Sequence, residues 1–324
     1  MSINNKKVLV IGASGSLGQG LCNEISSKYS VTGTYLNNKK VSDKVKYTHL
    51  DITKEIDFNT LDTDYDSVVL IAGAMPATME GYNPNKYFDV NVYGTINVLE
   101  FCRKNNIRKF IYIMTFSDRY NNFYNGVPIQ ADDVATLNYT GDHAIYSISK
   151  VTACEVIEHY HQEYGLQTII FRIPTVYCYD DKVDYYVDGK IKTKAYIKMI
   201  RDIIHKNEVE IWGDKNNAKD MPYIKDFARL ISLAIDNSKA QGVYNAGTGK
   251  PISLEELVNA MIKVFSIDGK TKIIHIKDNT SQPNFTFDMT KTIADFSFHP
   301  EYNIEMMLED IKKNLPKELL YGNY

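Results

Sequence analysis

The residues with the clearest chemical potential are Tyr146 and Lys150, which stand four positions apart in a segment with a helical pattern, 143–164. On a helix this spacing places both side chains on one face. A free tyrosine, with a pKa of about 10, is a weak base at neutral pH, but a neighbouring ammonium favours the phenolate and lowers that pKa. We therefore expect Tyr146 to exchange a proton with a substrate hydroxyl. Lys150 would lower the pKa of Tyr146 and bind a ribose hydroxyl.

Two hydroxyl groups follow a short apolar segment. The run from Lys109 to Met114 predicts a buried strand, Thr115 ends it, and Ser117 follows two residues later. At a strand end such a hydroxyl can hydrogen-bond a substrate oxygen whose charge changes during reaction. Taken alone, the pair also fits an ordinary Ser/Thr turn. The Tyr146/Lys150 spacing alone also fits an exposed helix surface, because the chain has 24 tyrosines.

The stretch from Lys7 to Gly18 predicts a nucleotide-binding turn. An apolar run predicts a strand, glycines follow at 12, 15 and 18, and an amphipathic pattern then begins. Glycine lets the backbone turn tightly beside a phosphate, and a helix N-terminus offers free N–H groups to it. The G-x-x-G-x-x-G spacing differs from the commoner G-x-G-x-x-G. It predicts that a dinucleotide pyrophosphate contacts Gly12, Ser14, Gly15, Ser16, Leu17 and Gly18.

Alternating strands and helices would position these residues. Apolar runs predict strands at 7–12, 30–35, 45–50, 66–72, 109–114 and 167–173, with helical patterns between most of them, notably 16–28, 84–105 and 143–164. This alternation predicts an α/β fold with a Rossmann-type, doubly wound parallel sheet in residues 1–175, completed by a strand near 242–245.

Residues 176–324 predict a small, more helical lobe. The stretch from Tyr177 to about Lys192 is polar and irregular, and helical patterns follow at 194–206, 224–237, 253–265 and 304–315. Short strands are predicted at 208–212 and 272–276. The lobe would lie over the carboxyl ends of the sheet strands, where open α/β sheets bind ligands, so the substrate would lie between the two parts.

Composition excludes several function classes. The chain has 324 residues, of which 44% are hydrophobic and 24% charged, and a formal net charge of −3. This balance does not favour nucleic acid or an anionic membrane as partner. No apolar run approaches the roughly 20 residues of a membrane span, and no Cys or His spacing matches a zinc site. We expect a cytoplasmic protein without a metal, nucleic-acid or membrane partner.

Taken together, these motifs resemble the extended short-chain dehydrogenase/reductase family, in its branch of sugar-nucleotide epimerases, dehydratases and 4-keto reductases. The matches run nearly end to end. They comprise the glycine turn, Asp51-Ile52-Thr53, Ala72-Gly73-Ala74, Asn91-Val92-Tyr93-Gly94-Thr95, Thr115, Tyr146 with Lys150, 171–177, 210–214, 219–226 and 242–249.

The resemblance implies site residues and an assembly. Thr115, Tyr146 and Lys150 would be catalytic, and helices 84–105 and 143–164 would form a homodimer interface. Beyond the glycine turn, the cofactor would contact Tyr35, Asn37, Lys39, Asp51, Ile52, Ala72, Gly73, Ala74, Asn91, Lys150 and Ile173. The substrate would contact Met75, Ser117, Thr175 and Lys219.

Several positions depart from the family pattern. Thr175 and Cys178 stand where Asn and Gly are usual, Lys219 stands where an Arg is common, and Gln282-Pro283 replaces an Arg-Pro. Neither Lys nor Gln reproduces the bidentate grip of Arg on phosphate. Either another cation binds the diphosphate, with Lys219, Arg201 and Lys198 as candidates, or the substrate is not a standard nucleotide sugar.

Further departures concern the type of reaction. Dehydratases of this family carry Asp-Glu directly after the catalytic Thr, whereas Phe116 and Ser117 follow Thr115 here, and Asp118 would point elsewhere. This argues against a 4,6-dehydratase. His143 and Cys178 either lie near the substrate or are ordinary packing residues.

The end of the second strand bears on the cofactor. No acid follows Tyr35 up to Lys40, and Lys39 and Lys40 are basic, which favours NADP over NAD unless both lysines are merely solvated. The missing acid also favours a 4-keto reductase over a 4-epimerase.

The function predicted from the sequence is NAD(P)-dependent hydride transfer at a sugar carbon, C4, of a nucleotide sugar. A reductase of a non-nucleotide carbonyl compound is an alternative, as is a non-catalytic cofactor-binding regulatory protein. The presence of Thr115, Tyr146 and Lys150 argues against the regulatory protein.

Overall fold

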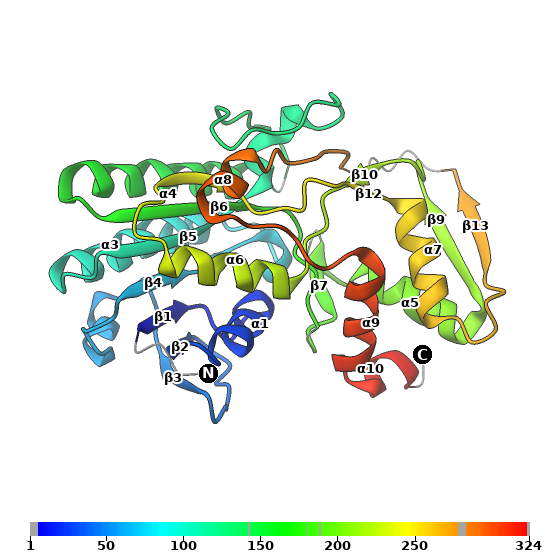
Figure 1. Ribbon diagram of the computed structural model, residues 1–324, viewed down its shortest axis with the longest axis horizontal. Helices are drawn as coiled ribbons and strands as arrows, with labels where there is room; N and C mark the ends of the chain where they lie inside the picture. Colours follow the sequence, from blue (N-terminus) through cyan, green and yellow to red (C-terminus); the bar gives the residue numbers. More distant parts are fainter. Residues whose placement is uncertain (1–5, 142, 180, 188, 278–282, 323–324) are drawn as a thin grey trace.

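A seven-stranded parallel sheet forms the centre of the N-terminal half of the molecule (Figure 1). The structure is a computed structural model that describes residues 6–141, 143–179, 181–187, 189–277 and 283–322. The strand order is β11-β6-β5-β4-β1-β2-β3. In chain order the bounds are β1 Lys7–Ile11, β2 Ser30–Tyr35, β3 Val45–His49, β4 Ser67–Leu70, β5 Lys109–Thr115, β6 Gln167–Ile173 and β11 Gly242–Asn245. The predicted α/β fold class is confirmed, because the sheet is parallel and helices flank it.

Alternate residues of the central strand β1 contact different helix layers. Val8 and Val10 belong to the apolar cluster that contains α1 (Ser16–Ile25) and α6 (Ile224–Asp236). Leu9 and Ile11 belong to the cluster that contains α3 (Gly94–Lys104) and α4 (His143–Tyr164). Burial on both faces is the reason that the parallel strands are continuous apolar runs rather than alternating ones.

Helix α6 differs in position from the sequence-based prediction, which placed 224–237 in the substrate lobe. It packs against α1 and covers the sheet. Its apolar residues recur at helical spacing and form one buried stripe, which suits a helix that lies on a sheet. The buried members are Ile224, Phe227, Ala228, Leu230, Ile231, Ala234 and Ile235.

The predicted helix 84–105 is interrupted. It consists of α2 (Pro84–Phe88), a π-helical turn η3 (Asp89–Tyr93) and α3. Single π-helical turns inside helices are rare and occur frequently at functional sites. The turn contains Asn91, a predicted cofactor residue.

The remaining elements form the C-terminal lobe. Strands β9 (Glu208–Trp212) and β13 (Lys272–Ile276) pair in parallel beside helices α5 (Ala195–Lys206), α7 (Leu254–Phe265), α9 (Ile304–Asn314) and α10 (Lys317–Tyr321). A two-stranded ribbon joins β10 (Ala218–Lys219) to β12 (Ile252–Ser253), and α8 (Thr290–Phe296) returns to the edge of the main sheet at β11.

The prediction of an irregular stretch from Tyr177 to about Lys192 was wrong in part. Strands β7 (Asp184–Val187) and β8 (Lys190–Thr193) form an antiparallel hairpin within it. Gly189, which precedes β8, adopts a φ of 72°, a left-handed conformation that glycine tolerates. Strand β7 reads Asp-Tyr-Tyr-Val without alternation, and β8 alternates only over Lys190-Ile191-Lys192, so their pattern did not indicate a hairpin.

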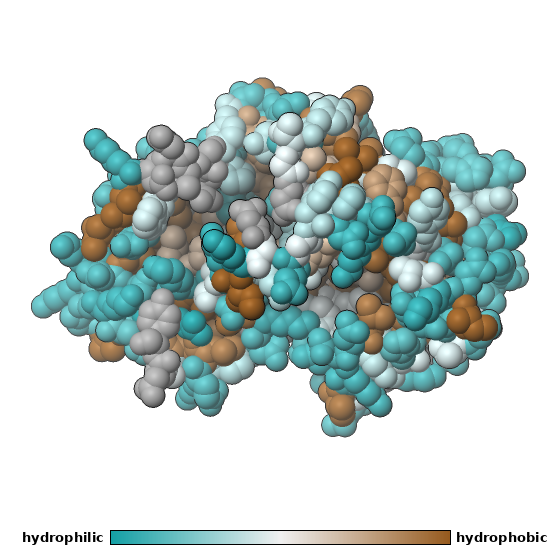
Figure 2. Space-filling view, turned by 180° about the vertical axis from the view of Figure 1, so that it is seen from behind, coloured by the Kyte–Doolittle hydropathy of each residue, from teal (hydrophilic) through white to brown (hydrophobic). Residues whose placement is uncertain are grey.

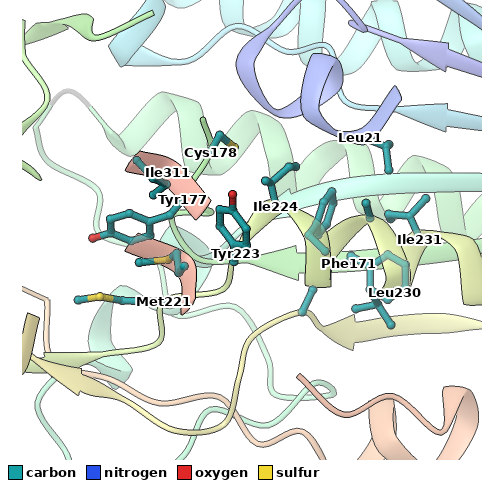
Figure 3. Packing of buried hydrophobic residues seen from close by; sticks show 14 of the residues in the cluster. Leu21, Phe171, Tyr177, Cys178, Met221, Tyr223, Ile224, Leu230, Ile231 and Ile311 are labelled. Atoms are coloured by element: carbon teal, nitrogen blue, oxygen red, sulfur yellow. The ribbon is translucent and has the colours of Figure 1, made fainter. Parts of the chain in front are cut away.

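One apolar cluster joins the two parts of the molecule. Figure 3 shows Leu21 of α1 and Phe171 of β6 near α6, with Tyr223 between them and Ile311 of α9. All of these side chains are buried. The C-terminal lobe is therefore held against the sheet by a continuous core.

Candidate active site

The carboxyl ends of β1 and β4 form a topological switch point. These strands pair with each other, while the chain continues from β1 to β2 on one side and from β4 to β5 on the other. In open α/β sheets, the crevice outside such a point is where ligands bind. The glycine turn follows β1 at this place.

The glycine turn can hold a pyrophosphate. Gly12 has a φ of 91°, and a Cβ there would lie 2.6 Å from the Ala72 nitrogen. A Cβ at Gly18 would lie 2.3 Å from the Gly12 oxygen. A Cβ at Gly15 would meet only that oxygen, at 3.4 Å, so open space adjoins the start of α1. Because no side chain caps α1, its first N–H groups remain available to an anion.

The adenosine side of the crevice lies at β2 and β3. The Gly12 N–H donates to Thr34 Oγ1 over 3.1 Å, a contact that the sequence did not indicate. Asp51 Oδ1 accepts hydrogen bonds from both the backbone and the hydroxyl of Thr53, which shapes the turn after β3. The Tyr35 ring lies edge-on to His49, and Asn37 and Lys39 are exposed.

The predicted cofactor residue Asn91 hydrogen-bonds both the turn after β4 and helix α4. Its amide group donates to the Ala74 carbonyl and to Ser149 Oγ, each at 3.0 Å, and accepts from the Ala74 N–H at 2.8 Å. Both amide protons are therefore used within the protein. Asn91 fixes the Ala72–Ala74 turn against α4 instead of offering a donor to a ligand.

A chain of hydroxyl groups ends at Thr115. Ser147 Oγ donates to Ser117 Oγ over 2.8 Å, and Ser117 Oγ lies 2.8 Å from Thr115 Oγ1. The Ser117 N–H also donates to Thr115 Oγ1, at 3.2 Å. Thr115 Oγ1 thus accepts from the Ser117 N–H, shares a hydroxyl hydrogen bond with Ser117 and also contacts the Tyr146 side chain. Sequence reasoning missed Ser147, although it is a hydroxyl residue within the Tyr146–Lys150 motif.

The pKa values of Tyr146 and Lys150 differ from those expected from the sequence. Burial raises the pKa of Tyr146 above its ordinary value, and the neighbouring Thr115 side chain lowers it only in part. Burial lowers the pKa of Lys150 to about 7. Lys150 Nζ donates to the Ile113 carbonyl at 2.7 Å and lies 4.0 Å from the centre of the Tyr112 ring. Lys150 is not among the groups that shift the pKa of Tyr146, so the structure does not show the expected lowering of that pKa by Lys150.

A buried ion pair fixes the segment after Thr115. Arg172 of β6 contacts both carboxylate oxygens of Asp118, with its Nε at 3.0 Å from each. Its Nη1 donates to the Ala131 carbonyl and to Asn245 Oδ1 of β11. Asp118 is only 2% exposed, so its carboxylate is occupied by Arg172 and does not reach the crevice. This agrees with the expectation that Asp118 points elsewhere.

The three cations proposed for a diphosphate have different surroundings. Arg201 Nε donates to the Leu319 carbonyl of α10, and Lys198 pairs with Asp202. These contacts occupy both side chains within the C-terminal lobe, so neither fits the expected role. The Lys219 ammonium has no hydrogen-bond or ion-pair partner among the described residues. Gln282 lies outside the described residues.

Asp220 fixes the segment that carries Lys219. It is fully buried and accepts hydrogen bonds from the N–H groups of Thr248, Gly249 and Phe287. Because these donors come from two loops, Asp220 holds Lys219 in a defined position.

The predicted cofactor residue Ile173 and the predicted substrate residues Thr175 and Met75 lie near strand ends. Ile173 pairs with Thr115 across β5 and β6, and Thr175 and Met75 are exposed. The His143 ring lies edge-on to Tyr146, with centroids 6.2 Å apart. Cys178 is buried, with its Sγ 3.7 Å from the Val176 carbonyl.

A pocket of about 690 Å³ adjoins the start of α4. Residues from the turn η2 (Pro76–Thr78), α4 and neighbouring loops line it, namely Pro76, Met79, Gly81, Tyr82, Tyr87, Tyr139, Gly141, Ala144, Ile145, Ile148 and Gly189. The face opposite to that of Figure 1 is hollowed near its middle (Figure 2). Within the described ranges, no helix is both long and apolar enough to cross a membrane.

Comparison with known proteins places this geometry in context. The model of the NAD dependent epimerase/dehydratase family matches residues 8–247. A putative UDP-glucose 4-epimerase of Methanocaldococcus jannaschii is 29% identical over 263 residues, which cover 77% of this chain and 79% of the relative. A UDP-glucuronate 4-epimerase of Thermodesulfobacterium geofontis is 27% identical over 292 residues, which cover 87% and 83%.

A solved structure shares the fold. The UDP-glucose 4-epimerase of Thermotoga maritima, crystallised with UDP-glucose, superposes with a TM-score of 0.78 at 19% identity, covering 95% of this chain and 98% of that chain.

The Lys150 environment predicts a pH dependence of stability. Because burial lowers the pKa of Lys150 to about 7, the unfolded chain, with a lysine pKa near 10.5, binds more protons at this site above pH 7. The free energy of unfolding of the cofactor-free wild type should therefore rise with pH relative to Lys150→Met. The slope should approach about 1.4 kcal/mol per pH unit between pH 7.5 and 9.5. Urea unfolding at several pH values measures the difference, and a flat or falling difference would contradict the buried, weakly basic lysine.

Proposed function

Because the chain belongs to the NAD dependent epimerase/dehydratase family, we propose that it epimerises a nucleotide sugar at C4. The observation that carries the proposal is the hydroxyl chain from Ser147 through Ser117 to Thr115, beside Tyr146. It places a hydrogen-bonding hydroxyl next to a tyrosine that can exchange a proton with the same substrate oxygen. The names of the relatives, both 4-epimerases, support the choice of reaction.

Each residue has a defined role in this proposal. Thr115 donates a hydrogen bond to the C4 oxygen of the sugar. This hydrogen bond strengthens as the oxygen loses its own proton. Tyr146 takes the proton of the C4 hydroxyl and returns it when the carbonyl is reduced. Lys150 binds the ribose of the cofactor. When bound, the nicotinamide would supply the hydride acceptor and donor for the sugar C4.

Lys219 is the proposed cation for the substrate diphosphate. Its ammonium lacks a protein partner among the described residues, and Asp220 fixes its backbone. A lysine is a point charge for phosphate rather than a bidentate fork. This single cation replaces the arginines that the family pattern led us to expect.

A second candidate function is a 4-keto reductase that uses NADPH. The observation that favours it is the end of β2, where Leu36 to Lys40 contain no carboxylate and Lys39 is exposed. Such an enzyme releases its cofactor after each turnover, whereas an epimerase recovers it in the starting oxidation state.

We also propose a homodimer formed through α3 and α4. Partly exposed residues recur along α4 at helical spacing, and Tyr93 at the start of α3 is 60% exposed. The α4 positions are Ile145, Ile148, Thr152 and Val156. An apolar stripe of this kind is buried when two helix pairs pack together.

The proposed reaction predicts interconversion without net cofactor use. With UDP-hexoses and UDP-uronates, the enzyme should exchange C4 epimers while NAD(P)H neither accumulates nor disappears. Tyr146→Phe should reduce turnover by about 10³-fold, because the proton exchange is lost, yet should retain cofactor binding. Tyr164→Phe, at the other end of α4, is the matched control and should be unchanged. With a 4-keto nucleotide sugar as substrate, NADPH consumption equal to product formed would establish the reductase instead.

The lysines after β2 predict a tolerance for NADP. We expect wild type to bind NADP at least as tightly as NAD, because no carboxylate there repels the 2′-phosphate. Lys39→Glu should weaken NADP by about tenfold, which is about 1.4 kcal/mol, and leave NAD unchanged. Titration calorimetry measures both affinities. A tenfold preference of wild type for NAD would contradict this assignment.

The interface proposal predicts a particle of twice the chain mass of 37.0 kDa. Sedimentation equilibrium should give this mass for wild type. Thr152→Arg should give the monomer, because it places two charges at a desolvated contact. Asn216→Arg, in the C-terminal lobe, is the control and should remain dimeric. A monomeric wild type at micromolar concentration would refute the interface.

A further inference from the structure

The glycine turn contains no cation of its own. From Val8 to Ser27 the sequence has neither Lys nor Arg, so the turn and α1 offer a pyrophosphate backbone N–H groups, the Ser14 and Ser16 hydroxyls and the dipole of α1, but no cationic side chain. A pyrophosphate carries negative charge that such groups compensate only in part. A side chain from elsewhere in the chain could supply the remaining positive charge.

Lys182 lies at this turn although it is far away in the sequence. Its Nζ donates to the Ser14 carbonyl over 2.9 Å, across 168 positions of the chain. Ser14 stands between Gly12 and Gly15, at the open space where a Cβ on Gly15 would have no near contact except the Gly12 oxygen. The ammonium is partly buried, which reduces the screening of its charge by solvent.

The residues on both sides of Lys182 fix its position. Val183 is buried in the main core, and its carbonyl accepts from the Lys194 N–H at 2.8 Å. Asp181 Oδ2 lies 3.9 Å from Nζ of Lys40, which follows β2. Upstream, the Tyr179 hydroxyl donates to Glu24 Oε1 of α1 over 3.0 Å. This connection after β6 therefore contacts the elements that flank the cofactor crevice.

We propose that Lys182 is a cofactor-positioning residue that supplies the positive charge for the pyrophosphate at the glycine turn. The assignment rests on the proposed function only in that a dinucleotide occupies the crevice. Lys182 follows β6 and lies outside the β1–α1 unit. Through it, the segment that leads into the β7–β8 hairpin would also contact the cofactor.

The test compares ligands with and without the pyrophosphate. Titration calorimetry with wild type, Lys182→Met and Lys182→Arg should use NAD, ADP-ribose and adenosine. Lys182→Met should weaken NAD and ADP-ribose by about tenfold and change adenosine less than twofold, because adenosine has no phosphate. Lys182→Arg should restore most of the affinity, since it keeps the charge. Lys192→Met, on the exposed strand β8, is the matched control and should bind all three ligands as wild type does.

The outcomes separate this proposal from the proposed function. Unchanged NAD affinity in Lys182→Met would overturn the role of Lys182 while leaving epimerisation intact. An equal loss for adenosine would also overturn it, because the lysine would then act on the fold rather than on the phosphates. Wild type that binds neither NAD nor NADP would overturn both.

Discussion

The buried ion pair between Arg172 and Asp118 is the interaction on which the arrangement of the site depends. It connects the ends of β5 and β6, and through Asn245 it includes β11. Replacing Arg172 would leave the buried Asp118 carboxylate with only the longer contact to Arg119, at 3.5 Å, which is costly in a dry environment. The pair therefore determines where the segment after Thr115 runs. Without it, the hydroxyl chain from Ser147 to Thr115 would lack a fixed end.

The polar groups near the crevice fall into two sets: those that are engaged within the protein and those that are available to a ligand. Asp118 and Asn91 are polar and near the site, yet their hydrogen-bonding groups are engaged within the protein. The groups that remain free to act on a ligand are the Thr115 hydroxyl and the N–H groups at the start of α1. Lys219 adds a cation from the C-terminal lobe. This separation allows a rigid frame with a few reactive groups.

Much of the fold was predictable because its signals are local. Apolar runs predicted β1 to β6, and the family resemblance, carried by the glycine turn and Tyr146-x-x-x-Lys150, is confirmed. The domain boundaries and the catalytic and binding roles of individual residues stay predictions. Asp118 and Arg172 are 54 positions apart in the sequence, and Ser14 and Lys182 are 168 apart. No local sequence pattern can therefore predict either contact. The raised pKa of Tyr146 depends on burial, which spacing on a helix does not reveal.

The central claim is that hydride leaves and returns to the same sugar carbon at the Thr115–Tyr146 site. The most direct measurement follows deuterium placed at C4 of the nucleotide sugar, with unlabelled cofactor and water, by mass spectrometry and NMR of the product epimer. The account predicts that the epimer keeps the deuterium at C4 and that none appears in free cofactor or solvent. Loss of the label to solvent, or its transfer to released cofactor, would contradict the account.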